Sequence, residues 1–336
     1  MRMRFTPAVL ALVAAVAAPA WPDSVPAADV RQNLYASCFV DAKEGWIVGD
    51  LGRVFHTVDG GLNWEIQATG TKRPFAGIAC TDRSNLWIAG QGGQIAHSTN
   101  GGKSWETQKS GSERQLLNIA FSNAKRGLAI GDFGTLLRTE DGGATWSKAA
   151  IPADLKLPPD IAEVVQPGDV VLYGLSFADA DHVWVAGEFG VIMASTDGGA
   201  TWQGQTSGVE TTLFGIRFAD QQKGWAVGID ETLLHTVDGG ATWQRQRVQT
   251  PKEYSLAFYD VDIKGAYAWV VGSSGLLLSS KDAGETWQLP PVPVQMRSVW
   301  FRGVTMFPEG RGLVVGSGGM MLTLDRDSFA TSKKQF

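Results

Sequence analysis

The sequence predicts an all-β fold, a seven-bladed β-propeller built from four-stranded blades. One segment of about 40 residues recurs along the chain, and each copy contains short strand-like runs separated by turn residues. The 336 residues include 41 glycines, which favours tight turns over long helices. Six copies close on a tryptophan: Trp64, Trp105, Trp146, Trp202, Trp243 and Trp287. Their spacings are 41, 41, 56, 41 and 44 residues, and all but the 56-residue one match the length of a propeller blade.

The amino-terminal segment is typical of a secretory signal peptide. Arg2 and Arg4 precede an apolar run over residues 8–18 that ends in small residues and is too short to cross a bilayer. We predict a signal peptide over residues 1–20, with cleavage near residue 27 as the alternative, and a single propeller over 21–336. The mature protein is therefore expected in the periplasm or another extracytoplasmic compartment.

The first copy defines the four strands of a blade. We expect strand a at 34–40, strand b at 45–48, strand c at 52–57 and strand d at 63–67. These runs are too short, and too rich in valine, isoleucine and glycine, for helices. Strand b begins again at Leu86, Gly127, Val183, Gly224, Ala268 and, in a worn seventh copy, Gly312. An open β-solenoid is the alternative, but it leaves exposed edges, whereas a ring closes on itself.

Closure of the ring depends on the seventh copy, which lacks the closing tryptophan of the repeat and has Phe329 near its place. Trp21 precedes Leu34 by thirteen residues, close to the eleven that separate Trp64 from Phe75. We therefore predict that the segment from Trp21 supplies the outer strand of blade 7.

The turn between strands c and d follows one pattern, as in T-V-D-G-G-L-N-W at residues 57–64. The aspartate accepts hydrogen bonds from its own turn, the glycines take positive φ, and the tryptophan buries a large surface. We predict a structural role for these tryptophans and for the polar residues Asp59, Asn100, Asp141, Asp197, Asp238 and Asp282.

These turns resemble the Asp-box, or BNR, repeat of sialidases and sortilin-type receptors. The longer pattern G-W-x-V-G-x-x-G-x-[IVL]-x-x-T-x-D-G-G-x-T-W resembles the photosystem II stability and assembly factor family over essentially the whole mature chain. The resemblance implies a non-catalytic scaffold that binds a membrane protein complex, and we expect the protein to be a monomer. The partner it implies is a photosystem II intermediate in a phototroph, or an envelope transporter in another bacterium.

Composition and motif chemistry limit the other functions. The net charge of −5 and the scattered basic residues argue against nucleic acid. Five turn aspartates spread around a ring do not supply the two carboxyls, about 5 to 10 Å apart, that glycoside hydrolysis needs. We therefore expect no enzymatic activity and no cofactor. A carbohydrate-binding or sialidase-like propeller remains the alternative, and aromatic side chains at the channel mouth would support it.

The histidines and cysteines do not form a recognisable metal site. His56, His97 and His235 recur at nearly one position on strand c, which indicates packing rather than metal binding. Cys38 and Cys80 lie on the inner strands of adjacent copies, where we expect buried free thiols rather than a disulfide.

The 56-residue spacing marks one long connection, residues 151–172, whose prolines oppose a regular helix. Its apolar side chains either pack on the propeller or meet a partner. We predict a partner site on the face that carries the d–a connections and the b–c turns, across blades 3 to 5. Its residues are Asp132, Glu188, Asp230 and Glu231 of the turns and Leu155, Leu157, Ile161 and Val164 of the connection. A mixed-charge solvated rim is the alternative.

Overall fold

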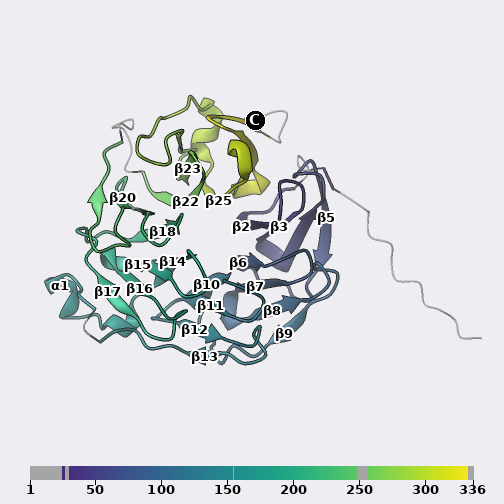
Figure 1. Ribbon diagram of the computed structural model, residues 1–336. Coiled ribbons are helices and arrows are strands. Elements are labelled where there is room, and N and C mark those ends of the chain that lie inside the picture. The colour runs from purple at the N-terminus through teal and green to yellow at the C-terminus, as the bar shows by residue number, and fades with distance from the viewer. Residues whose placement is uncertain (1–24, 27–29, 154, 249–255, 332–336) are drawn as a thin grey trace, which may run out of the picture.

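The computed structural model describes residues 25–26, 30–153, 155–248 and 256–331, and it is a seven-bladed β-propeller, as predicted (Figure 1). The inner strands surround the centre of the ring. They are β2 (Leu34–Phe39), β6 (Phe75–Cys80), β10 (Leu116–Phe121), β14 (Leu172–Phe177), β18 (Leu213–Phe218), β22 (Phe258–Lys264) and β25 (Phe301–Met306).

The second and third strands of every blade are antiparallel neighbours of the inner strand. The second strands are β3 (Gly45–Gly49), β7 (Leu86–Gly90), β11 (Gly127–Gly131), β15 (Val183–Gly187), β19 (Gly224–Gly228), β23 (Tyr267–Gly272) and β26 (Arg311–Gly316). The third strands are β4 (Arg53–Thr57), β8 (Ile95–Ser98), β12 (Leu136–Thr139), β16 (Ile192–Ser195), β20 (Leu233–Thr236), β24 (Leu277–Ser280) and β27 (Met321–Asp325). The bounds in the first blade agree with the prediction to within a residue.

The outer strands vary most in length. They are β5 (Asn63–Ala68), β9 (Glu106–Gln108), β13 (Ser147–Lys148), β17 (Gln203–Gln205), β21 (Gln244–Arg245) and β28 (Ser328–Thr331). In blade 6 the outer strand is reduced to one bridge between Ser279 and Gln288, because Pro290 and Pro291 follow after a single residue.

Blade 7 closes the ring with its own outer strand, so the predicted exchange with the amino-terminal segment is wrong. β28 pairs with β27, while the short strand β1 (Val25–Pro26) pairs with β5 on the outside of blade 1. Trp21 lies outside the described residues. Blades 1 and 7 meet through the Ser37 and Thr305 hydroxyls at 2.8 Å and through the Gly318 N–H, which donates to Asn33 Oδ1. The hydrophobic contact between these two blades therefore closes the ring without exchanging a strand.

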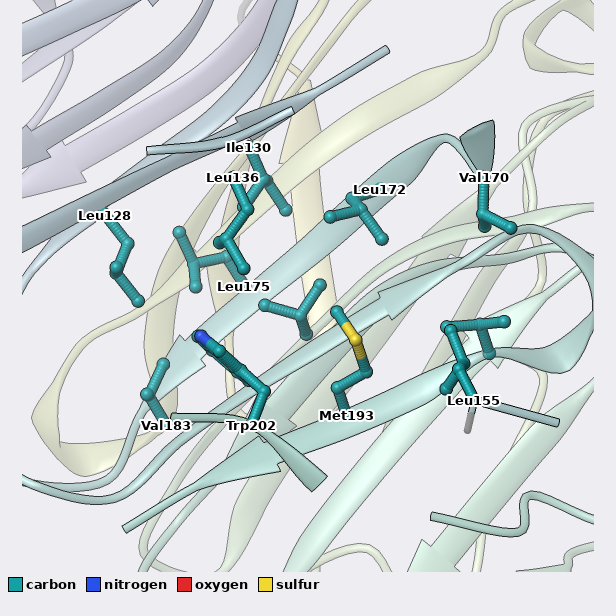
Figure 2. Close-up of a cluster of buried hydrophobic side chains, with 12 residues drawn as sticks. Leu128, Ile130, Leu136, Leu155, Val170, Leu172, Leu175, Val183, Met193 and Trp202 are labelled. Carbon is teal, nitrogen blue, oxygen red and sulfur yellow. The ribbon is translucent and has the colours of Figure 1, made fainter. Parts of the chain in front are cut away.

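The core consists of apolar layers between neighbouring blades. Figure 2 shows the layer between blades 3 and 4, where Leu128 and Leu136 of blade 3 meet Val183 and Met193 of blade 4. Strand alternation explains the layers, since successive residues of a strand face opposite neighbouring blades.

The c–d turns have the predicted hydrogen bonds. In blade 3, Asp141 Oδ1 accepts from Thr139 Oγ1 at 2.8 Å and from the Thr145 N–H at 2.9 Å. The Thr145 hydroxyl donates to Asp141 Oδ2, and these bonds lower the pKa of Asp141 to about 2. Gly143 follows with φ +89°. The carboxylate thus stabilises its own turn.

A glutamine contact that the sequence reasoning missed joins consecutive blades. Three residues after the closing tryptophan, a glutamine side chain donates through Nε2 to a turn glycine carbonyl of the next blade at 2.8–2.9 Å. We call this contact the glutamine clasp. The glutamines are Gln67, Gln108, Gln205 and Gln246.

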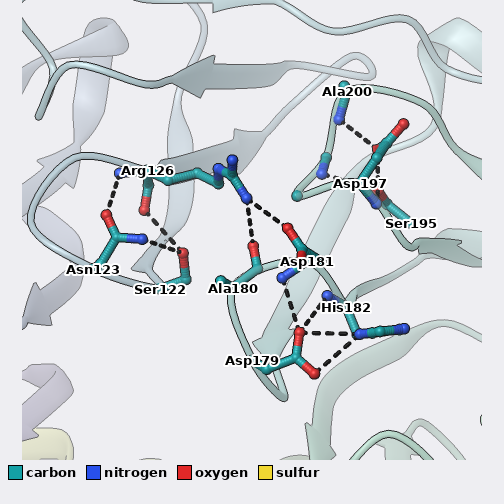
Figure 3. A network of polar contacts seen from close by, with 12 residues as sticks. Ser122, Asn123, Arg126, Asp179, Ala180, Asp181, His182, Ser195, Asp197 and Ala200 are labelled. Atoms are coloured by element: carbon teal, nitrogen blue, oxygen red, sulfur yellow. Dashed lines mark hydrogen bonds and ion pairs between the residues drawn. The ribbon is translucent and has the colours of Figure 1, made fainter.

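The joint between blades 3 and 4 uses other groups, because Ala149 occupies the glutamine position. Arg126 Nη1 donates to the Ala180 carbonyl at 3.0 Å and to Asp181 Oδ1 at 2.7 Å (Figure 3). Arg138 Nε donates to the Gly198 carbonyl at 3.1 Å.

The two cysteines form a disulfide, so the prediction of free thiols is wrong. Cys38 of β2 and Cys80 of β6 have Cα atoms 6.0 Å apart and link blades 1 and 2 in the channel wall. The two cysteines differ by one residue in register, Cys38 corresponding to Ala79, and the packing of neighbouring inner strands still brings them within bonding distance. Sequence spacing alone does not reveal that proximity.

We expect the variant with Cys38→Ala and Cys80→Ala to lose about 2–4 kcal/mol of unfolding free energy, because the bond restricts the unfolded chain across 42 residues. Denaturant titrations of the oxidised protein and of this variant measure the difference. The variant should unfold identically with and without reductant. Equal stability of the oxidised protein and the variant would contradict the prediction.

Candidate functional site

The two faces of the ring are arranged as predicted. The c–d turns contact the a–b turns, as where the Gly142 N–H donates to the Lys125 carbonyl at 2.8 Å. The b–c turns contact the d–a connections, as where the Asp132 N–H donates to the Gln115 carbonyl at 3.0 Å. We call this second side the loop face. Its turns are the short 3-10 segments Asp50–Gly52, Gln91–Gly93, Glu188–Gly190 and Ser317–Gly319 and their equivalents.

The predicted acidic residues of blades 3 and 4 lie near the channel mouth. Burial raises the pKa of the Tyr173 hydroxyl, and the nearby Glu188 and Asp132 carboxylates raise it further. Burial also raises the pKa of Asp132, against the opposing effect of Arg114. Glu188 Oε2 accepts from the Val171 N–H at 3.0 Å, so part of its carboxylate supports the chain entering β14.

Asp230 and Glu231 hold a strained turn in blade 5. Both residues have φ +55°, and Glu231 occupies the position where the equivalent turns of the other blades have glycine. The Glu231 N–H donates to the Leu256 carbonyl, and Arg245 Nη2 donates to the Asp230 carbonyl at 2.7 Å. The acidic pair therefore belongs to the loop face, as predicted.

The predicted apolar residues of the long connection fall into two groups, one packed in the core and one at the outer rim. Leu155 is buried in the layer between blades 3 and 4, against Gly204 of β17, and Leu157 packs beside it. Ile161 is half-buried in the one-turn helix α1 (Pro159–Ala162), which lies on the outer rim, and Val164 is 79% exposed (Figure 1). A second turn, Pro167–Asp169, leads into β14. The connection thus lies at the rim, and Asp132 and Glu188 lie at the channel.

The channel holds a cavity of about 410 Å³, which all seven inner strands line. The second residue of each inner strand forms one tier around the mouth, and we call this set the mouth tier. In chain order it contains Tyr35, Ala76, Leu117, Tyr173, Phe214, Tyr259 and Arg302. The aromatic members lie in contact across blades: the ring centroids of Tyr173 and Phe214 are 5.1 Å apart, and those of Phe214 and Tyr259 are 5.4 Å apart.

Arg302 is the single charged residue of the mouth tier. Its guanidinium carbon lies 5.3 Å from the Phe214 ring centroid and 5.1 Å from that of Tyr259, a cation–π arrangement. Burial lowers its pKa, and the nearby Asp260 carboxylate opposes that shift. Next to Arg302 in the tier, on blade 1, the Tyr35 hydroxyl donates to Asp50 Oδ1 at 2.7 Å. Burial and this hydrogen bond raise the pKa of Tyr35 to about 12.

Two aspartates link blade 6 to blade 7 in the channel wall. Asp260 Oδ2 accepts from the Val304 N–H at 2.9 Å, and Asp262 Oδ2 accepts from the Met306 N–H at 2.7 Å. Asp262 also pairs with Arg217 at 2.8 Å. Burial raises the pKa of Asp260 to about 7, and the Asp262 carboxylate adds to the rise.

We expect this raised pKa to make stability depend on pH near neutrality. The folded-state pKa of Asp260 lies above its unfolded value of 3.8, so its stabilising contribution is complete below pH 3.8 and is lost as the pH rises through about 7. Relative to Asp260→Asn, the native protein should lose about 2 kcal/mol between pH 5 and pH 8.5. Urea unfolding across this range measures the difference.

The histidines His97 and His235, whose pKa values are lowered by burial, titrate in both proteins and cancel in the difference. Parallel stability curves for the native protein and the Asp260→Asn variant would contradict the assignment.

Other side chains in the described ranges do not form a metal site: no group of three or more histidine, cysteine, aspartate or glutamate residues is placed to hold an ion. His56, His97 and His235 stack on the tryptophans Trp46, Trp87 and Trp225, with ring centroids 4.3–4.7 Å apart. This is the packing role that the sequence predicted for them.

The fold and its aspartate turns define an Asp-box propeller. The chain belongs to the family described as photosynthesis system II assembly factor YCF48, whose sequence profile matches residues 15–111, 104–203 and 203–298. No curated protein sequence matches the chain.

Solved structures share the fold at low sequence identity. A structure described as YCF48 bound to D1 peptide is 20% identical, with a TM-score of 0.70, and the match covers 93% of this chain and all of that one. YCF48 from Cyanidioschyzon merolae is 19% identical, with a TM-score of 0.70 and coverage of 90% and 98%. A GH74 xyloglucanase from Xanthomonas campestris is 14% identical, with a TM-score of 0.69, and the match covers 89% of this chain and 53% of the enzyme.

Proposed function

We propose that the protein is a non-catalytic scaffold of the photosystem II assembly-factor type, which holds a segment of a protein partner on its loop face. The observation that carries the proposal is Glu231 of the acidic pair Asp230 and Glu231, which has φ +55°. Positive φ at the Asp230 position recurs in other blades, at Leu51, Phe133, Phe189 and Ser274, so the strain particular to blade 5 is that of Glu231. A glycine at Glu231 would relieve strain, and six equivalent turns have it. Strain that is retained in one sector of a repetitive ring is typical of a functional site.

The proposed partner is a subunit of a membrane complex. Family membership supports this class, and one similar structure is described as YCF48 bound to D1 peptide. In a phototroph the partner would be a photosystem II intermediate, and in another bacterium an envelope transporter. We propose that the protein acts as a monomer. No helix within the described residues is long and apolar enough to cross a membrane.

The proposed contact surface spans blades 3 to 5. Asp132, Glu188, Asp230 and Glu231 would attract a basic segment and make binding sensitive to salt. Exposed Val164, with Ile161 behind it, would supply apolar contact from the rim. Leu155 and Leu157 are occupied by packing, so they would hold the connection in place rather than touch the partner.

Absence of catalysis is part of the proposal. The Asp-box carboxylates are engaged in their own turns, as Asp141, Asp197 and Asp238 show by accepting hydrogen bonds from threonine or serine hydroxyls of the same turn. The hydrogen bonds hold the pKa of Asp141 and of Asp238 near 2, so neither is suited to act as a general acid.

An oligosaccharide is the second candidate ligand, because the aromatic side chains of the mouth tier gather at the channel mouth. Aromatic rings present apolar faces on which sugars pack. Calorimetric titration with xyloglucan and sialyl oligosaccharides tests this candidate. Binding that Tyr259→Ala abolishes would favour it over a protein partner.

We propose an extracytoplasmic location. The disulfide between Cys38 and Cys80 supports it, because such bonds persist in oxidising compartments. The test is intact-mass measurement of the protein purified from the soluble extracytoplasmic fraction of its own cells. A mature chain that starts near residue 21 or 28 is expected, and retention of Met1 would contradict the proposal.

The function is tested by capture of membrane complexes from the host, using purified protein and mass spectrometry of the bound subunits. The key variant is Glu231→Gly, which should be more stable than the native protein by about 1 kcal/mol yet capture at least about tenfold less partner. A gain in stability with a loss of capture separates function from folding.

A second pair of variants controls for surface changes. Val164→Asp alters the proposed surface, and Val237→Asp makes the same change at a valine that is 56% exposed on the Asp-box face. Only Val164→Asp should reduce capture. Full capture by both Glu231→Gly and Val164→Asp would refute the proposed surface, and failure of the native protein to capture any membrane subunit would refute the function.

A further inference from the structure

Arg302 has a free hydrogen-bonding edge. Its guanidinium carbon lies over both the Phe214 and the Tyr259 ring, 5.3 Å and 5.1 Å from their centroids, which are 5.4 Å apart. Within the described part of the chain the guanidinium makes no hydrogen bond and no ion pair. Three arginines that do form ion pairs provide the contrast: Arg217, Arg126 and Arg83 each have a carboxylate oxygen within 2.8 Å. The donors of Arg302 therefore face the channel cavity of about 410 Å³.

We propose that Arg302 binds a carboxylate group of a ligand that enters the channel mouth. The planar guanidinium offers paired N–H donors that match the two oxygens of a carboxylate, and the flanking rings fix its orientation. Because the site is partly removed from water, such a pair is stronger there than on an open surface.

The surroundings of Arg302 define the rest of the ligand. Phe214, Tyr259 and Tyr173 form an apolar wall next to it, which suits an aromatic or aliphatic group adjoining the carboxylate. Asp260 is the nearest acidic neighbour, but burial raises its pKa to about 7, so it neutralises Arg302 only in part at neutral pH. The ligand is thus a carboxylate next to an apolar group.

This inference rests on the proposed function, since it assigns the carboxylate to the bound peptide as either an acidic side chain or a carboxyl terminus. Three synthetic probes distinguish the sources. They are N-acetyl-Ala-Phe-Ala with a free carboxyl terminus, the same peptide as its amide, and N-acetyl-Ala-Phe-Glu amide.

Binding of each probe is followed at pH 7 by the fluorescence of the native protein, because Trp300 stacks on Tyr35 at the mouth, with ring centroids 5.9 Å apart. At least one carboxylate probe should bind about tenfold or more tightly than the neutral amide, which corresponds to about 1.4 kcal/mol. Which carboxylate probe binds identifies the source. Equal binding of all three probes, or binding of none up to millimolar concentration, would overturn the proposal.

Two variants assign the effect to Arg302. Arg302→Met should remove the preference for the carboxylate, and Arg302→Lys should retain only part of it, because lysine keeps the charge and loses the paired donors. Should Arg302→Met fail to fold, Arg302→Lys decides alone, and an unchanged preference in it would refute the role of the guanidinium. A native protein that captures its membrane partner but does not distinguish the probes would refute this inference and leave the proposed function standing.

Discussion

Replacing Trp87 by alanine should lower the free energy of unfolding by about 4–5 kcal/mol. The side chain is fully buried between two rings, with centroids 3.8 Å from Phe121 and 4.3 Å from His97. Its Nε1 also donates to the Gly142 carbonyl of the next blade at 2.8 Å. Loss of this side chain therefore leaves a cavity at a joint between two blades. Urea denaturation measures the effect.

Trp87→Phe separates packing from hydrogen bonding. Phenylalanine keeps most of the buried surface, and Gln108 still donates to the Gly142 carbonyl, so we expect a loss of only about 1–2 kcal/mol. Trp105→Ala is the control at a half-buried tryptophan of the same blade and should have a smaller effect than Trp87→Ala. A loss below 2 kcal/mol for Trp87→Ala would contradict its role in joining the blades.

Replacing Gly93 by alanine should destabilise the protein by more than about 3 kcal/mol. Gly93 has φ +71°, and an added Cβ would collide with the Ser112 carbonyl oxygen of the adjacent connection. Backbone strain and displacement of that connection then add. Thermal and denaturant unfolding both report the loss.

Gly111 provides a matched control in the same blade. Its φ is +72°, but nothing lies within 4 Å of an added Cβ. Gly111→Ala should therefore show the strain of the left-handed conformation alone, about 1 kcal/mol. Equal losses for the two substitutions would mean that close approach to Ser112 contributes nothing.

Local features of the fold could be predicted from the sequence because the repeat shows them several times. Each strand of the first blade ends within a residue of its predicted bounds, and the Asp59 turn forms the expected bonds, since both depend on residues close together in the chain. The disulfide and the ring closure were predicted wrongly, because each depends on which strands become neighbours after folding.

The candidate site was predicted only in part, for the same reason. Asp132 and Glu188 were found by comparing equivalent turns, and the structure places both by the channel. The mouth tier was missed, although a signal was present: the second residue of the inner strand is aromatic in four copies, at Tyr35, Tyr173, Phe214 and Tyr259. The stacking of Arg302 on two of these rings has no counterpart in a single copy, so alignment of copies cannot show it.

The glutamine clasps also have a mechanical consequence. They join blades 1 to 3 into one arc and blades 4 to 6 into another. Blade 7 lies between blades 6 and 1 and has no clasp to either arc. The joint between blades 3 and 4 has the Arg126 and Arg138 hydrogen bonds in place of a clasp. Deformation of the ring should therefore concentrate at the two joints of blade 7, which have neither a clasp nor these arginine bonds. Arg302 belongs to blade 7, while Phe214 and Tyr259 belong to the arc of blades 4 to 6. A ligand that contacts Arg302 and these rings together would bridge one of these compliant joints and stiffen the whole ring.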